Sequence, residues 1–425
     1  MTAVTTQHCA ACGHRLGELD PAPACPACGG LLEVRHAHAT PPDVATLRAA
    51  FLGRCCTRPG AIASGVWRYR ELVLPNAERP VSHPEGNTPL LDRPPVAAWA
   101  GCSRLLLKHE GHNPTGSFKD RGMTVGVTQA VRVGARAVAC ASTGNTSASL
   151  AAYAAQAGLP ALVFVPAGRI ALGKLTQTLA YGARTLLVRG DFDACLALVR
   201  AASAQLGIYL LNSVNPFRLE GQKTIVFELL QQLDWEPPDW LAVPAGNLGN
   251  TAAFGKALRE LRDLGLVRRV PRLVAVQAAG AAPFARGFAE GFATRHRVPA
   301  ETVATAIRIG DPASWDRAVR AIRETDGVVV DVPDEEIVEA KAVIDRAGVG
   351  CEPASAASVA GVRRLVRQGV IAPGASVVAV LTGHVLKDPE LLVRYHQQEE
   401  PPPALANRPI EIDATLAAVE RVLRG

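Results

Sequence analysis

From Arg104 onward, short apolar runs alternate with stretches of helical pattern, and this alternation limits the chain to a few folds. Consecutive strand–helix–strand units produce parallel strands that are covered by helices on both faces. The pattern therefore predicts an α/β fold with parallel-rich sheets. Because the predicted strands outnumber those of one six-stranded unit, we expect two lobes. The predicted strands are 105–108, 137–141, 161–165, 185–188, 209–211, 241–243, 273–276, 328–332 and 377–381, and the clearest predicted helices are 145–157, 194–205 and 217–233.

The cysteines form a second pattern. The chain has 10, and four of them make two C-x-x-C pairs: Cys9, Cys12, Cys25 and Cys28. This spacing is typical of a tetrahedral four-cysteine zinc site, and four thiolates leave no position for a catalytic water. So short a segment cannot build a core, so bound zinc would supply its folding energy. Four unrelated thiols or a redox pair are the alternatives, but a redox C-x-x-C normally occurs once. The other six are predicted to be packing residues: Cys55, Cys56, Cys102, Cys140, Cys195 and Cys351.

Composition narrows the class of protein. The chain has 45 Lys and Arg against 39 Asp and Glu, a net charge of +6 over 425 residues. So small a net charge on a chain of this length predicts neither a nucleic-acid nor a membrane partner. No apolar run reaches the roughly 18 residues of a membrane span. Residues 1–14 lack the basic and apolar regions of a signal peptide, so we expect a cytoplasmic protein.

Three polar turns that contain glycine directly follow predicted strands: 142–146, 246–250 and 382–384. Ligands of α/β folds bind beyond the carboxyl ends of the strands, so these turns are expected to meet at one cleft. The second turn is suited to an anion, because its glycines free the backbone N–H groups and a helix dipole follows. An ordinary strand–helix connection is the alternative. The turn consists of Gly246, Asn247, Leu248, Gly249 and Asn250, which is neither a dinucleotide-binding nor a P-loop pattern.

The stretch 113–121, NPTGSFKDR, places a lysine at a predicted helix start. Ser117 and Asp120 resemble a capping box that would begin a helix at Phe118. Lys119 would then lie in the first turn, where the helix dipole disfavours the ammonium form. A partly neutral amine in a cleft can form a Schiff base, although a solvated lysine is the common case.

A further stretch, 212–218, places Arg218 near the hydroxyl of Ser213, directly after the strand 209–211. An arginine beside hydroxyl and amide groups could bind an oxyanion through two N–H groups. A helix cap with a surface arginine is the alternative.

These motifs and their order resemble those of threonine synthases. Threonine synthases are fold type II pyridoxal-phosphate enzymes with a tryptophan synthase β-like fold. The matching stretches are 85–90 (EGNTPL), 113–122, 142–146 (STGNT), 212–224, 246–250 (GNLGN), 277–281, 304–310, 352–357 and 382–389. The resemblance implies that Lys119 forms the Schiff base, Asn145 bonds the phenolic oxygen, residues 246–250 hold the phosphate and Thr382 meets the pyridine nitrogen. It also implies substrate contacts from Thr146, Ser213, Arg218 and Asn247.

By the same resemblance, the reaction is γ-elimination of phosphate from O-phosphohomoserine followed by β-addition of water, which gives L-threonine. Two alternatives stay open: β-replacement or elimination on another amino acid such as phosphoserine, as in cysteate synthase or a specialised-pathway enzyme, and a zinc-ribbon interaction protein. We expect a zinc-ribbon-like segment at 1–38, a linker at 39–84 and a two-lobed catalytic region at 85–425. A homodimer is a further expectation, and the purpose of the ribbon stays open.

Overall fold

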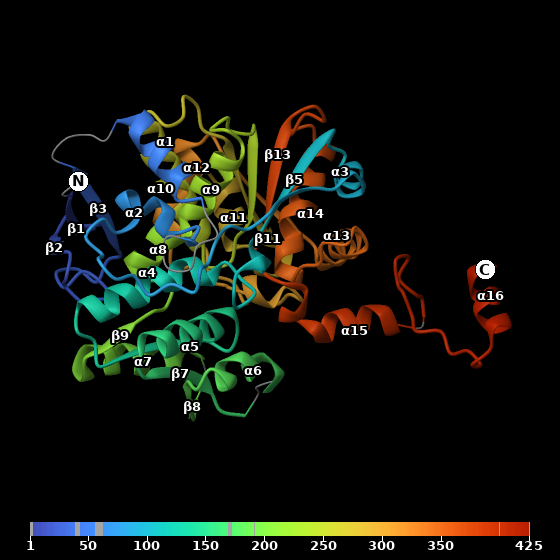
Figure 1. Cartoon of the computed structure of the whole chain (residues 1–425), viewed down its shortest axis with the longest axis horizontal. Helices are drawn as coiled ribbons and strands as arrows, with labels where there is room; N and C mark the ends of the chain where they lie inside the picture. Colours follow the sequence, from blue (N-terminus) through green and yellow to red (C-terminus); the bar gives the residue numbers. More distant parts are fainter. Residues whose placement is uncertain are drawn as a thin grey trace.

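The computed structural model describes residues 3–38, 43–55, 63–168, 172–190, 192–398 and 400–424. Two α/β lobes are built on separate sheets, and a small N-terminal sheet lies against them (Figure 1). The larger sheet has the strand order β12-β11-β10-β13-β5-β4, and only the edge strand β4 is antiparallel to its neighbour. Its strands are β4 (Leu90–Asp92), β5 (Arg104–His109), β10 (Trp240–Pro244), β11 (Arg272–Ala278), β12 (Val328–Val332) and β13 (Ser376–Leu381).

The larger sheet buries both faces: β10 is apolar and buried at every position, and β13 is apolar and buried at every position after Ser376. On β10, Trp240 and Ala242 belong to one core cluster, whereas Leu241 and Val243 belong to the other. The first cluster packs under α3 (Pro94–Ala100), α13 (Asp334–Arg346) and α14 (Pro353–Arg367). The second packs under α9 (Thr224–Gln232), α10 (Gly249–Asp263) and α12 (Trp315–Glu324).

The smaller sheet is entirely parallel, with the strand order β8-β7-β6-β9. Its helix α4 also packs against α8, which carries part of the larger lobe's core. The two lobes are therefore joined along these helices. The elements are α4 (Lys119–Arg132), β6 (Ala137–Ala141), α5 (Asn145–Ala157), β7 (Ala161–Pro166), α6 (Leu172–Ala180), β8 (Arg184–Val188), α7 (Phe192–Leu206), β9 (Ile208–Leu210) and α8 (Pro216–Gln222).

The structure confirms the two predicted lobes, and a strand covers most or all of each predicted run. The prediction of one continuous helix at 217–233 is wrong, because the structure divides this stretch into two helices, α8 and α9. The division lies where Gly221 packs on α4: a Cβ atom there would lie 1.7 Å from the carbonyl oxygen of Arg121. The hydroxyl of Thr224 also donates to the Gly221 carbonyl oxygen (2.6 Å).

The described part of 39–84 is packed into the larger lobe rather than spanning a gap. It contains α1 (Val44–Gly53), a short 3-10 turn (Trp67–Tyr69) and α2 (Arg70–Val73). Phe51 and Tyr69 are buried in the core, with ring centroids 4.9 Å apart. Positions 39–42 and 56–62 of the predicted linker lie outside the described residues.

The N-terminal sheet, which we call the ribbon, has the order β2-β1-β3 and is antiparallel throughout. Its strands are β1 (Ala3–Cys9), β2 (Arg15–Gly17) and β3 (Leu32–His38).

The cysteines outside the ribbon were predicted to be packing residues. Four of them are buried as predicted: Cys102, Cys140, Cys195 and Cys351. Cys55 is exposed, so its prediction as a packing residue is wrong: it follows the last turn of α1, past the buried face of that helix. Cys56 lies outside the described residues.

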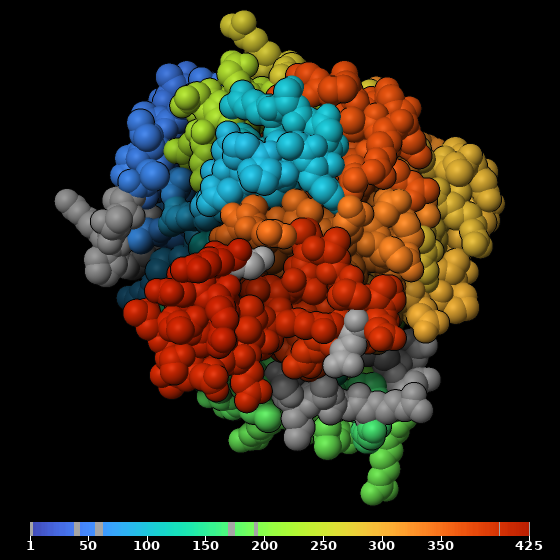
Figure 2. All heavy atoms as spheres, turned by 90° about the vertical axis from the view of Figure 1, so that its right-hand side faces the viewer, coloured from blue at the N-terminus to red at the C-terminus, as the bar shows by residue number. Residues whose placement is uncertain are grey.

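The C-terminal residues form an arm that leaves the two lobes. It comprises α15 (Pro389–Gln397) and α16 (Leu416–Arg424), and α16 lies away from both sheets in Figure 1. Figure 2 turns this side toward the viewer, and the arm covers the lower part of the face. Within the described residues, no helix has the length and apolar character to cross a membrane.

Candidate active site

Lys119 is the first residue of α4, and the loop before it is fixed against the end of β13. The N–H of Phe118 donates to the carbonyl oxygen of Thr382 (3.0 Å), and the N–H of His384 donates to that of Gly116 (2.9 Å). The two motif stretches 113–122 and 382–389 are therefore joined by backbone hydrogen bonds. The lysine that the sequence singled out lies next to the polar end of a strand of the larger sheet.

The predicted capping box is wrong. Lys119, not Phe118, begins the helix, and the side chain of Asp120 does not turn back to cap it. Asp120 is fully buried and accepts hydrogen bonds from the N–H of Thr115 (2.7 Å), the hydroxyl of Thr115 (2.6 Å) and the hydroxyl of Ser149 (2.6 Å). The carboxylate holds the preceding loop in place, because partners from that loop and from α5 satisfy it inside the protein.

The surroundings of Lys119 favour the neutral amine. Burial and the positive charge of Arg218 together lower the pKa of its side chain to about 7, although the charge of Glu352 acts in the opposite direction. The Nζ atom also lies 4.0 Å from the centroid of the Phe118 ring. Near neutral pH a substantial fraction of this amine is therefore unprotonated, as nucleophilic and proton-accepting lysines require.

Glu352 joins the other predicted groups around the lysine. It precedes α14 and is buried, and one carboxylate oxygen accepts from Asn145 Nδ2 (2.9 Å) while the other accepts from Thr382 Oγ1 (3.2 Å). Thr382 Oγ1 also lies 2.9 Å from Ser355 Oγ. Burial raises the pKa of Glu352, against the lowering effect of these hydrogen bonds. The amide of Asn145 and the hydroxyl of Thr382 are thus fixed from a single side chain.

The glycine turn 246–250 lies between β10 and α10, as predicted for an anion cradle. Gly246 cannot be replaced without displacing backbone, because a Cβ atom there would lie 2.8 Å from Ile307 Cα. Leu248 has φ of 61°, so the turn uses the left-handed region directly before the helix. The first-turn N–H groups of α10 have no partner inside the helix, which suits them to an anion.

Asn247 connects this turn to the smaller lobe. Its Nδ2 donates to Ser213 Oγ (2.6 Å), and its Oδ1 accepts from the N–H of Ala313 (2.6 Å). Ser213 follows β9, so a residue from each lobe meets here. Thr146 is half-buried in the first turn of α5, beside Asn145.

Arg218 is buried in α8 with unused donors. Only 1% of the residue is exposed, and its Nη1 donates to the carbonyl oxygen of Leu211 (3.0 Å). Its Nε and Nη2 have no hydrogen-bond partner within the described ranges. Buried donors are normally paired, so this guanidinium is poised for an anion. The surface-arginine alternative is excluded by the burial.

The predicted groups therefore gather at the carboxyl ends of strands from both sheets. Gln222 of α8 lies between α4 and the glycine turn: a Cβ atom at Gly122 would lie 3.1 Å from Gln222 Nε2, and one at Gly249 would lie 3.5 Å from its Oε1. Around the cradle, four buried oxygens have no partner in the described part of the chain: Gln222 Oε1, Asn250 Oδ1, Thr251 Oγ1 and Ser314 Oγ. Of these four oxygens, the hydroxyls of Thr251 and Ser314 can donate to a phosphate. These hydroxyls, the left-handed turn and a partly neutral lysine together fit a phosphorylated aldehyde cofactor.

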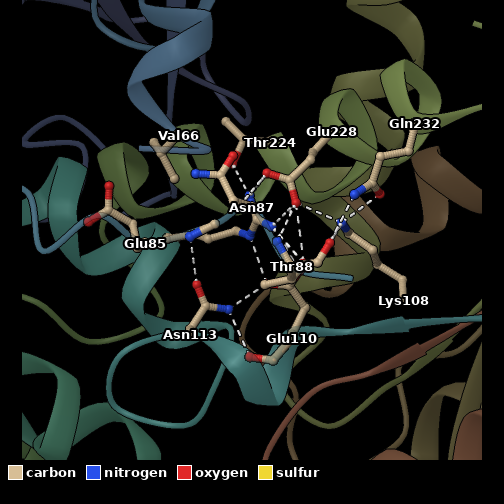
Figure 3. Close-up of polar contacts among 12 residues, drawn as sticks. Val66, Glu85, Asn87, Thr88, Lys108, Glu110, Asn113, Thr224, Glu228 and Gln232 are labelled. Carbon is tan, nitrogen blue, oxygen red and sulfur yellow. Dashed lines mark hydrogen bonds and ion pairs between the residues drawn. The ribbon is translucent and has the colours of Figure 1, made fainter. Parts of the chain in front are cut away.

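A buried ion network includes a residue in the first turn of α4, and Figure 3 shows its members Lys108, Glu110 and Glu228. Arg121 donates to Glu110 (2.7 Å) and Glu228 (2.8 Å), and Lys108 pairs with Glu228 (2.6 Å). The N–H of Thr88 also donates to Glu228 (2.9 Å), which fixes the 85–90 stretch on α9. Two anions and two cations thus balance, and Arg121 lies only two positions after Lys119.

The four N-terminal cysteines come together as a group. Their Sγ atoms all lie within 4.8 Å of one another, and three of the separations are 3.5 Å, 3.6 Å and 3.4 Å. Gly13 and Gly29, which follow the second cysteine of each pair, have φ of 75° and 73°. Each pair therefore lies on the same kind of tight turn.

Four functional candidates were missed by sequence reasoning. Glu352 lies in a quoted motif without an assigned role, Ser355 follows it in the same motif, and Gln222 gave no signal beyond its place in the 212–224 stretch. Lys387 also reaches this region, because a Cβ atom at Gly116 would lie 2.9 Å from Lys387 Cε. The sequence motifs contain these residues, but the orientation of their side chains depends on packing between segments that are distant in the sequence.

Comparison with known proteins agrees with this geometry. Residues 81–383 match the family model described as pyridoxal-phosphate dependent enzyme. The chain is 44% identical to threonine synthase of Methanosarcina acetivorans over 420 residues, covering 98% of each, and 50% identical to that of Synechocystis over 312 residues, covering 73% of this chain and 79% of that one. The solved structure of Escherichia coli threonine synthase superposes with a TM-score of 0.67 at 19% identity over 99% of both chains. The solved maize serine racemase gives 0.63 at 20% identity over 85% of this chain and 99% of that one, so these two structures show the shared fold.

Proposed function

We infer the function from the family: the chain belongs to the pyridoxal-phosphate-dependent enzymes, and it is an enzyme of threonine synthesis. The fold type II architecture and the site between the two sheets agree with this assignment. The roles of individual residues, the substrate and the ribbon metal are our proposals.

The residues around Lys119 would hold pyridoxal phosphate. Lys119 would bond to the cofactor's aldehyde, Asn145 would hydrogen-bond its phenolic oxygen, and Thr382 would meet its pyridine nitrogen. The turn of Gly246, Asn247, Leu248, Gly249 and Asn250 would hold its phosphate. The bound cofactor supplies an electron sink that acidifies the hydrogens next to an amino-acid nitrogen. Because a hydroxyl partner does not keep the ring nitrogen protonated as a carboxylate does, elimination and replacement suit this site better than transamination.

We propose O-phosphohomoserine as the substrate, and the observation that carries this proposal is Arg218. Its two unpaired N–H groups are buried near Lys119, whose pKa its charge lowers. An amino acid without a phosphate would leave them unpaired at a cost of about 1–3 kcal/mol. Ser213, Asn247 and Thr146 complete the proposed substrate contacts.

The proton transfers fall to the chain's own lysine. Lys119 Nζ takes the proton from the α-carbon of the substrate, and then assists at the β-carbon while phosphate leaves the γ-carbon. Arg218 stabilises the departing phosphate through its unpaired donors. Water then adds at the β-carbon, so that O-phosphohomoserine and water give threonine and phosphate.

Substrate turnover tests this proposal. Purified protein supplied with pyridoxal phosphate should release phosphate from O-phosphohomoserine and form threonine in equal amounts. The Lys119→Ala variant should lose both the activity and the visible absorbance of lysine-bound cofactor. Phosphate release from O-phosphoserine alone would contradict the proposal and favour the β-replacement alternative. A colourless wild type, even after cofactor is supplied, would instead favour the zinc-ribbon interaction protein.

We also propose that Cys9, Cys12, Cys25 and Cys28 bind a structural zinc ion. Zinc–sulfur distances of about 2.3 Å in a tetrahedron place sulfur atoms roughly 3.8 Å apart. The separations between these Sγ atoms support such a site. Residues 1–38 then form a zinc-ribbon segment, and 85–425 form the catalytic region. A homodimer and a cytoplasmic location complete the proposal.

A further inference from the structure

The ribbon is held on the two lobes by buried polar contacts along β3. The His36 Nε2 atom lies 3.3 Å from Glu220 Oε2 of α8, and Lys256 Nζ of α10 donates to the carbonyl oxygen of Val34 (2.7 Å). Glu220 is fully buried and also pairs with Lys256 and Lys223. Val34 itself belongs to the main core of the larger lobe. This interface is thus continuous with the protein interior.

Two further helices contact the ribbon at other points. Beyond β2, Gln129 and Arg132 in the last turns of α4 donate to Glu18, at 2.6 Å to its carbonyl oxygen and 2.7 Å to its carboxylate. On α12, Arg320 pairs with Glu33 of β3, and Arg317 donates to the carbonyl oxygen of Leu32. The ribbon therefore spans α4, α8, α10 and α12.

Three of these helices also carry the proposed catalytic groups. The helix α4 begins at Lys119, α8 carries Arg218 two residues before Glu220, and α10 begins at Gly249 of the glycine turn. A rigid helix moves as a unit, so a shift where the ribbon contacts it also shifts the group at its start.

The cysteines lie at the end of the ribbon sheet. Cys9 is the last residue of β1 and pairs directly with Leu32, the first residue of β3. Leu32 packs with Cys9 and Cys25 in a small core of their own. Bound metal would fix this pairing, and through it the course of β3 across the helices.

We propose that the metal-loaded ribbon is a clamp that sets the relative positions of Lys119, Arg218 and the glycine turn. Glu18 and His36 are its positioning residues, since they reach the helices from the ribbon without touching the site. This inference rests on the proposed function for the roles of the three groups. It makes cofactor affinity depend on a metal that lies outside the active site.

Two kinds of variant separate the metal from the contacts. Cys12→Ser removes a proposed ligand, with Cys55→Ser as its control, because Cys55 is exposed and outside the ribbon. The double variant Glu18→Ala/His36→Ala keeps the ligands but removes the side-chain contacts of Glu18 with Arg132 of α4 and of His36 with Glu220 of α8. It should still fold, because Glu220 keeps Lys223 and Lys256 as partners.

The measurements are zinc content, hydrogen exchange and the Kd for pyridoxal phosphate, all on the full chain. We expect Cys12→Ser to lose zinc and the double variant to keep it. Both should exchange faster in peptides of α4, α8 and α10, and bind pyridoxal phosphate roughly 2- to 30-fold more weakly. Peptides of α14 provide the internal control and should not change.

The proposal is overturned if metal-depleted protein exchanges faster only within residues 3–38 and binds pyridoxal phosphate as Cys55→Ser does. Wild type treated with a chelator gives the same comparison if Cys12→Ser fails to fold. Failure of the proposed function is a separate result, since wild type would then form no threonine, whereas exchange and cofactor binding are measured without substrate.

Discussion

Arg218 is a buried cation that has two unpaired donors and acts on the pKa of Lys119. In Arg218→Gln the repulsion of the Lys119 ammonium is lost, so the pKa of Lys119 should rise above about 7. Attachment of pyridoxal phosphate to apoenzyme requires the neutral amine, so its pH midpoint should rise as well. The KM for O-phosphohomoserine should rise roughly 10- to 150-fold, the equivalent of about 1.5–3 kcal/mol for hydrogen bonds to a charged group.

Visible absorbance of apoenzyme mixed with cofactor between pH 6 and 9 gives the midpoint, and steady-state kinetics give KM. The exposed Arg136→Gln variant is the control. If Arg218→Gln loses cofactor binding altogether, Arg218 belongs to the cofactor's phosphate site and the substrate assignment is wrong.

Single residues were predictable where their chemistry is local. Lys119 was found because a glycine-containing loop, a helix start and a lysine occur together within nine residues of sequence. Glu352 could not be assigned, because its partner Asn145 lies 207 positions away and only the meeting of two lobes brings them together. Asp120 was misassigned for the same reason, since its partner Ser149 comes from α5.

At the scale of elements, α4, α9 and β5 depend on one carboxylate. Glu228 of α9 holds Arg121 of α4 and Lys108 of β5, and all three side chains are buried. Glu228→Gln leaves two cations with one anion fewer, so the free energy of unfolding should fall by about 3–5 kcal/mol. Urea unfolding measures this loss. The exposed pair of Glu339 and Arg363 is the control, because Glu339→Gln should cost less than about 1 kcal/mol.

The carboxylate of Glu228 also makes the stability of the protein depend on pH. The charges of Arg121 and Lys108 hold the pKa of Glu228 well below its usual value near 4.3. Its contribution to stability is therefore present above that value and declines as the pH falls toward the folded-state pKa. Wild type should lose stability between pH 5 and 3 more steeply than Glu228→Gln, and equal slopes would show that Glu228 is not the group responsible.

Elements were predicted well where periodicity decides them. Apolar runs bounded by turns located the strands of both lobes, because parallel strands bury both faces and hold no alternating polar residues. The edge strand β4 was missed because its three residues carry little pattern and its pairing depends on β5. The segment around Phe51 and Trp67 was predicted to be a linker, although it is packed into the core. Its partners in that core, such as Phe227, lie far away in the sequence, so the local pattern does not indicate the packing.

At the scale of the whole molecule, the C-terminal arm belongs to neither of the two lobes nor to the ribbon. Its exposed apolar side chains include Leu416 and Leu423, which are 76% and 81% exposed, together with Ile410 and Val419. Such a face is unusual on a monomer. Each Leu or Val buried against a second copy would contribute about 1.5–3 kcal/mol, before the entropy of association is subtracted.

We therefore expect the full chain to be a dimer and the truncated chain 1–398 to be a monomer at micromolar concentration. Light scattering during size exclusion measures the mass of each. Leu416→Ser/Leu423→Ser should weaken the dimer in the same direction, whereas Leu52→Ser, an exposed leucine of α1, should leave it unchanged. Because the arm follows the 382–389 stretch directly, cofactor absorbance should be recorded for each variant. A truncated chain that binds cofactor and remains dimeric would place the subunit interface outside the part of the arm that follows residue 398.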